Sequence, residues 1–201
     1  MSQVPQGINV IPGEDLARAD YYAVLSRLFF SPPDQAFLAT LAAAGDAAQQ
    51  GALPAAWNAL CAAAAATTAD AAQDEYAALF VAIGKPPVVL YASWHLTGFM
   101  MEKPLAKLRE DLAELGLARS GAILEPEDHF AALMDSMRHL VLDKTLSDAQ
   151  RLALQQRFFS SHISTWYENL CNAIDEQPEA RLYRRVAGFI RIFFEVEKIL
   201  L

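Results

Sequence analysis

The fold class is decided by residues 125–141, which read EPEDHFAALMDSMRHLV. Apolar side chains in this stretch recur at the spacing of one helix face, as Phe130, Leu133, Met134, Met137 and Val141. A proline among acidic residues is typical of a first helical turn, where no amide hydrogen is needed and carboxylates favour the positive end of the helix dipole. We therefore expect a helix that begins near Pro126.

The helical period extends over most of the chain. Ser31-Pro32-Pro33 and Gly84-Lys85-Pro86-Pro87 interrupt it, and only Val88-Val89-Leu90 has β character, which is too short to form a sheet. We expect an all-α, single globular bundle of roughly seven to nine helices in one domain, 1–201, with residues 1–13 flexible. A loop at 116–124 is the expected hinge. The helices are expected at about 21–30, 34–44, 54–65, 67–80, 93–115 (with Ser93 as its N-cap), 126–141, 159–170 and from Pro178 onward.

Composition limits the kinds of function. The chain has 201 residues, a net charge of −8 and 54% hydrophobic residues, which favours a folded globule and opposes nucleic acid as a ligand. Two cysteines are typical of a reduced, cytosolic protein. The start carries no basic leader, and the longest uncharged stretch, 47–69, is mainly alanine. We expect a cytoplasmic protein without membrane insertion.

Enzyme and metal signatures are missing from the sequence. Gly84-Lys85 is followed by proline and does not form a phosphate loop, and Ser93 lies in no nucleophile elbow. Adjacent Asp128 and His129, if helical, would point about 100° apart, which does not suit a catalytic triad. His129 and His139 would lie on different helix faces, so no metal site is expected. The chain is predicted to be a non-enzyme without cofactors.

Two segments carry the candidate site. Tyr91, Trp94, His95 and Phe99 follow a proline-rich loop, where their rings either pack in the core or line an apolar peptide groove. The acidic segment 125–129 is, taken alone, most simply a solvated helix start. This interpretation does not account for His129. A histidine at a helix N-terminus favours the neutral form, which could order a loop or contact a peptide backbone.

These segments resemble the TorD/DmsD/NarJ family of cytoplasmic chaperones that mature molybdenum-cofactor redox enzymes. Residues 74–80, DEYAALF, are similar to the family's Tyr-x-x-Leu-Phe, and 91–94, YASW, to its aromatic-x-Ser element. Residues 125–129 match its Glu-Pro-x-Asp-His signature. The C-terminal part is similar through His162, Trp166, Tyr183, Ala187 and Phe189. The resemblance extends from about residue 15 to the end and lies nearer the TorD/DmsD branch.

The resemblance implies a chaperone that binds the twin-arginine signal peptide or the apo form of a molybdoenzyme catalytic subunit, assists cofactor insertion and delays export. Domain-swapped homodimers occur in the family, with 116–124 as the hinge here. On this basis Asp128→Ala or His129→Ala should lower partner affinity without loss of stability. The alternatives are a helical scaffold whose aromatic surface is an oligomer interface, and an enzyme using Ser93 or His129. The implied binding residues are Tyr91, Ser93, Trp94, His95 (where other members carry an aromatic), Phe99, Glu125, Pro126, Asp128 and His129.

Overall fold

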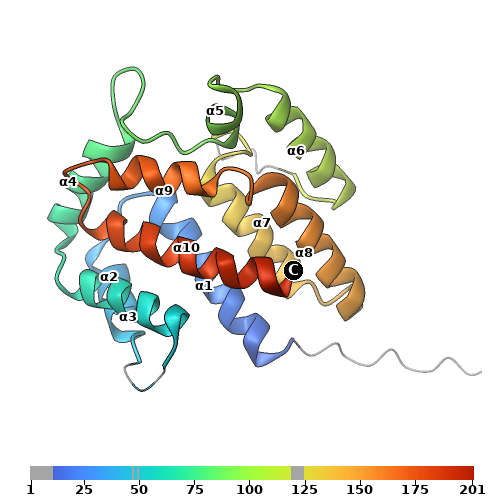
Figure 1. Cartoon of the computed structure of the whole chain (residues 1–201), viewed down its shortest axis with the longest axis horizontal. Coiled ribbons are helices and arrows are strands. Elements are labelled where there is room, and N and C mark those ends of the chain that lie inside the picture. The colour runs from blue at the N-terminus through green and yellow to red at the C-terminus, as the bar shows by residue number, and fades with distance from the viewer. Residues whose placement is uncertain (1–10, 47, 49, 119–124) are drawn as a thin grey trace, which may run out of the picture.

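The computed structural model describes residues 11–46, 48, 50–118 and 125–201. Within these ranges the chain forms ten α-helices and no strand, so the all-α prediction is confirmed (Figure 1). The helices are α1 (Gly13–Phe30), α2 (Gln35–Ala43), α3 (Ala52–Ala65), α4 (Ala69–Phe80), α5 (Ala92–Thr97), α6 (Lys103–Glu114), α7 (Phe130–Leu142), α8 (Asp148–His162), α9 (Tyr167–Asp175) and α10 (Leu182–Leu200).

The helix number exceeds the expected seven to nine because the structure divides the predicted 93–115 helix and separates α8 from α9. Gly98 ends α5 with a φ of 81°, a left-handed conformation that glycine adopts without strain. The chain then restarts at α6, where Pro104 lies in the first turn. Between α8 and α9, Trp166 adopts a non-helical conformation.

Three expected helix starts are wrong. Pro126 precedes α7 by a turn, and His129 is the N-cap instead. Ser93 is the second residue of α5, whose N-cap position is Tyr91. Pro178 likewise lies before α10, which begins at Leu182. In each case the proline or serine suited a first turn by its own chemistry, while contacts from distant residues determined where the helix begins.

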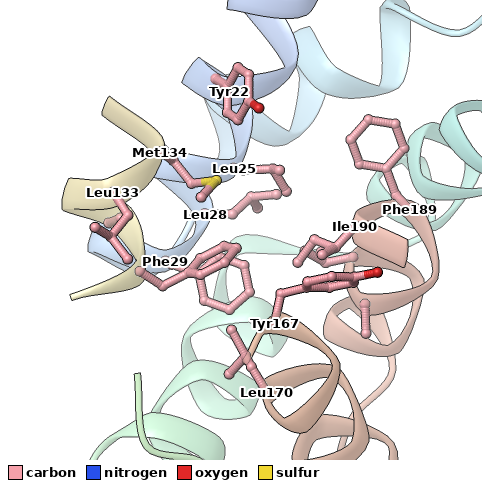
Figure 2. Close-up of a cluster of buried hydrophobic side chains, with 14 of the residues drawn as sticks. Tyr22, Leu25, Leu28, Phe29, Leu133, Met134, Tyr167, Leu170, Phe189 and Ile190 are labelled. Carbon is pink, nitrogen blue, oxygen red and sulfur yellow. The ribbon is translucent and has the colours of Figure 1, made fainter. Parts of the chain in front are cut away.

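The core forms where α1 packs along α7 and α10 packs against α3 and α9. Figure 2 shows side chains from these helices meeting in one cluster, with Leu25 and Phe29 from α1, Met134 from α7, Leu170 from α9 and Ile190 from α10. All five are fully buried. Apolar burial on this scale supplies the main driving force for folding.

A buried carboxylate of α4 caps the last helix. Glu75 of α4 accepts hydrogen bonds from the backbone amides of Arg181, Leu182 and Tyr183, at 2.8, 3.1 and 2.8 Å. These amides lie at the start of α10, whose own N-cap residue makes no side-chain bond. The carboxylate therefore satisfies amides that a helix leaves unpaired at its N-terminus.

The expected hinge at 116–124 lies mostly outside the described residues, as does most of the segment 1–13 that was expected to be flexible. Within the described part, Gly116 follows α6 with a φ of 69° and Ile11 is buried. No helix of the described residues is long and apolar enough to cross a bilayer.

Candidate functional site

A short antiparallel bridge joins the two segments singled out by the sequence. The Phe130 amide donates to the Leu90 carbonyl at 2.8 Å, and the Ala92 amide donates to the Asp128 carbonyl at 3.0 Å. Tyr91 and His129 form the bridge pair between these bonds. The residues with β character thus pair with the turn before α7, and the bridge fixes the starts of α5 and α7 against each other.

Asp128 caps α5 from across the chain. It is 1% exposed, and its Oδ2 accepts hydrogen bonds from the Ser93 amide at 2.9 Å and the Ser93 hydroxyl at 2.5 Å. A carboxylate in this position is stabilised by the positive end of the helix dipole. Its second oxygen, Oδ1, has no hydrogen-bond partner among the described residues. Asp128 is therefore first a structural residue, and Ser93 receives a cap instead of providing one.

His129 is the N-cap of α7 and is held in its neutral form. Its Nδ1 accepts a hydrogen bond from the Ala131 amide at 3.2 Å, a role that is available only when this nitrogen carries no proton. Burial lowers the pKa of His129, and the nearby carboxylates of Glu125 and Asp128 oppose that shift only in part. The proton of the neutral ring is then on Nε2, which makes no hydrogen bond within the described parts of the chain.

The acidic residues of the turn are held by partners of their own. The Tyr91 hydroxyl donates a hydrogen bond to Glu125, and burial, with Glu125 beside it, raises the pKa of Tyr91. Arg109 of α6 contacts Oε2 of Glu127 through Nε at 2.9 Å and through Nη2 at 2.8 Å. The turn is therefore anchored to both α5 and α6.

Beside the turn lies a cleft of about 450 Å³, bounded by the end of α1, the end of α6 and one face of α7. Glu125, Glu127 and His129 line it, and Asp128 does not. Asp128 lines a separate pocket of about 70 Å³ with residues of α5, α6 and α8. Asp128 and His129, which are adjacent in sequence, thus line different cavities. This is expected where an extended backbone directs neighbouring side chains to opposite sides.

The expected aromatic residues do not join this cleft. Trp94 is partly buried under the Lys85 ammonium, which lies 4.1 Å from the ring centre. His95 contacts the Val89 carbonyl through Nε2 at 2.7 Å and stacks on Trp166 with ring centres 5.0 Å apart. Phe99 is 68% exposed in the turn between α5 and α6. Tyr91, Ser93, Glu125, Pro126, Asp128 and His129 are brought together, whereas Trp94, His95 and Phe99 surround the start and end of α5.

The cleft also contains residues that the sequence reasoning missed. Ala132, Asp135, Ser136 and His139 line it from α7, and Phe30 lines it from α1. The four α7 residues share a face because they are three, four and seven positions apart. That small and polar face was visible in the sequence opposite the apolar stripe, but the position of Phe30 depends on how α1 packs on α7.

The fold is similar to that of a solved structure described as a putative redox enzyme maturation protein from Archaeoglobus fulgidus. The two structures align with a TM-score of 0.61 and 20% identity, over 89% of this chain and 93% of the other. The sequence matches the family described as nitrate reductase delta subunit over residues 46–172, which includes the whole 125–129 turn. The chain belongs to this family, so the resemblance seen in the sequence is confirmed.

Curated relatives carry the name chaperone protein TorD. The protein of Vibrio cholerae O395 is 27% identical over 130 residues, which are 62% of this chain and 59% of the relative. The protein of Vibrio atlanticus is 27% identical over 111 residues, 50% of this chain and 52% of the relative. The similarity therefore spans less than two thirds of the length of these relatives.

Proposed function

We propose that this protein is a cytoplasmic chaperone for the maturation of a molybdenum-cofactor redox enzyme. It binds the twin-arginine signal peptide or the apo form of the catalytic subunit, and it releases this partner after cofactor insertion. Membership of the family and the chaperone names of the Vibrio relatives support this role.

The observation that carries the proposal is the cleft beside the 125–129 turn. Its described lining includes the carboxylates of Glu125, Glu127 and Asp135 together with apolar side chains, and of these Glu127 already pairs with Arg109. A signal peptide with a basic start and an apolar middle needs acidic groups next to an apolar surface. The bridge and the Ser93–Asp128 bonds hold one wall of this cleft in place before any partner arrives, which reduces the entropy lost on binding.

The same geometry supports a role without catalysis. Asp128 bonds to Ser93 and not to a histidine, while Nδ1 of His129 is occupied by the Ala131 amide. A relay needs the acid to orient the histidine that activates the serine. Ser93, His129 and Asp128 are the best candidates for nucleophile, base and acid. They instead form the hydrogen bonds at the starts of α5 and α7.

Calorimetric titration with a synthetic twin-arginine signal peptide tests the proposal, with a twin-lysine peptide as control. The signal peptide should come from a molybdoenzyme encoded beside this protein. We expect saturable binding that weakens in the twin-lysine version. A protein that binds neither this peptide nor the full apo-enzyme in a pull-down would contradict the chaperone role.

A second candidate function rests on the turn between α5 and α6. At the end of α5 and in this turn, Leu96, Phe99, Met100 and Met101 are 41%, 68%, 39% and 71% exposed, which gives four large apolar side chains within six residues. In a scaffold protein such a surface would be an oligomer interface. Sedimentation equilibrium of the wild type and of Phe99→Ser tests this: a stable dimer that Phe99→Ser converts to a monomer would favour the scaffold.

A further inference from the structure

The cleft contains a hydrogen-bond donor that the protein leaves unused. His129 is 7% exposed and lines the cleft. Its Nδ1 is occupied by the Ala131 amide, so Nε2–H is the free donor of the ring and has no partner among the residues described. This N–H is open to the cleft, so a ligand segment that displaces water there should supply an acceptor for it.

Asp135 adds a negative charge to the same cleft. This carboxylate lies on the α7 face that lines the cleft, and it makes no ion pair or hydrogen bond with the part of the chain that the structure describes. It lies six residues beyond His129, which is about 9 Å along a helix axis at 1.5 Å per residue. The ligand should therefore carry an acceptor at one end and a cation some distance from it.

Phe30 provides an apolar surface in the same cleft. It is the last residue of α1 and is 55% exposed although it lines the cleft. A large ring held at the edge of an acidic cleft suits a cation with an apolar stem and a flat head.

We propose that this cleft receives one arginine side chain of the bound segment. This rests on the proposed function and identifies which part of the partner the cleft recognises. The carbonyl of the arginine residue accepts a hydrogen bond from Nε2–H of His129, its methylene stem lies along Phe30, and its guanidinium pairs with Asp135. Phe30 and Asp135 are thus the residues that distinguish arginine from lysine, because a planar guanidinium stacks on a ring and forms paired bonds to a carboxylate, whereas an ammonium does neither as well.

The test compares affinities for twin-arginine and twin-lysine peptides across a set of surface variants. We expect Asp135→Asn and Phe30→Ala each to weaken twin-arginine binding about tenfold, as for the loss of a charge-assisted bond or an aromatic contact. The preference over twin-lysine should fall in both variants. Phe30→Tyr should keep the preference and Phe30→Leu should lose it, because only tyrosine retains the ring.

Matched controls are available outside the cleft. Asp20→Asn removes an exposed charge from α1 about 15 Å along the helix from Phe30, and Ile199→Ala removes an exposed apolar side chain of α10 that does not line the cleft. Both should leave the affinity within about twofold of the wild type. Thermal melts of all variants exclude unfolding as the cause of lost binding.

The outcomes separate the two proposals. If the wild type prefers twin-arginine and Phe30→Ala and Asp135→Asn keep that preference, the arginine pocket is overturned while the chaperone role stands. If the wild type binds the apo-enzyme but no signal peptide, the arginine pocket is likewise overturned. If the wild type binds neither, both proposals fail.

Discussion

Asp128 accepts two hydrogen bonds from Ser93, one from its amide and one from its hydroxyl, across 35 positions of sequence. Both residues are buried, at 1% and 0% exposure, so the contact joins the start of α5 to the turn before α7 inside the protein. The contact gives Ser93 and Asp128 a structural role that involves no partner protein.

This contact changes the expected effect of replacing Asp128. Asp128→Ala removes both bonds and leaves the start of α5 without its cap, so we expect a loss of about 2 kcal/mol in the free energy of unfolding. The sequence had suggested unchanged stability. Urea unfolding of Asp128→Ala, Ser93→Ala and the double variant measures the coupling between the two residues, expected at about 1 kcal/mol. Additive losses would show that the two side chains act independently.

Glu75 should be a second residue with a large effect on stability. Glu75→Ala deprives three amides at the start of α10 of their acceptor, and we expect a loss of about 2–3 kcal/mol. Glu75→Gln keeps one side-chain oxygen and should lose about half as much. Chemical unfolding of the two variants provides the measurement. Equal losses in both would mean that the negative charge, and not the number of acceptors, stabilises the helix.

The buried pair of Arg18 and Glu197 links α1 to α10. Arg18 donates to Glu197 through Nε and Nη2, each at 2.7 Å, and the Tyr22 hydroxyl donates to the same carboxylate at 2.7 Å. Glu197→Ala leaves the guanidinium without its fully buried partner, so a loss of about 3–5 kcal/mol is expected. Replacing both residues, as Arg18→Met with Glu197→Leu, should cost less than Glu197→Ala alone. Thermal unfolding distinguishes the two, and a double variant as unstable as the single one would contradict this account.

Stability should fall in mildly acidic solution. Burial lowers the pKa values of His95, His129 and His162 below the usual 6.5. The unfolded chain then binds protons near pH 6.5 that the folded chain accepts only at lower pH, so the free energy of unfolding decreases as pH falls below 6.5. Each histidine contributes at most about 1.4 kcal/mol per pH unit.

His129→Asn tests how much of this pH dependence comes from the histidine in the 125–129 turn. Asparagine keeps an oxygen that can cap α7 but does not titrate, so the variant should fold and show a shallower pH dependence between pH 5 and 7. Melting temperatures measured across this range, with the wild type as reference, provide the comparison. An unchanged slope would show that the other histidines account for the effect.

The sequence by itself determined the class of fold and the family. Apolar spacing along 130–141 and in the C-terminal segments specifies amphipathic helices, because a side chain repeats its direction about every 3.6 residues whatever the neighbouring elements are. The Glu-Pro-x-Asp-His signature and the accompanying motifs likewise identified the family without any structure. The Thr68 cap of α4 and the Ser147–Gln150 capping box of α8 are local as well, although the helix expected in the second region began only at 159.

Only the tertiary structure decided what the motif residues do. Pro126 has the chemistry of a helix start, yet α7 begins four residues later because the bridge to 90–92 holds the intervening turn extended. Asp128 and His129 separate into different cavities, and Phe30 and Asp135 meet in one cleft, through the packing of α1 on α7. Helix periodicity depends on residues a few positions apart, whereas caps and clefts depend on contacts between residues 35 to about 100 positions apart, and no local pattern encodes such pairs.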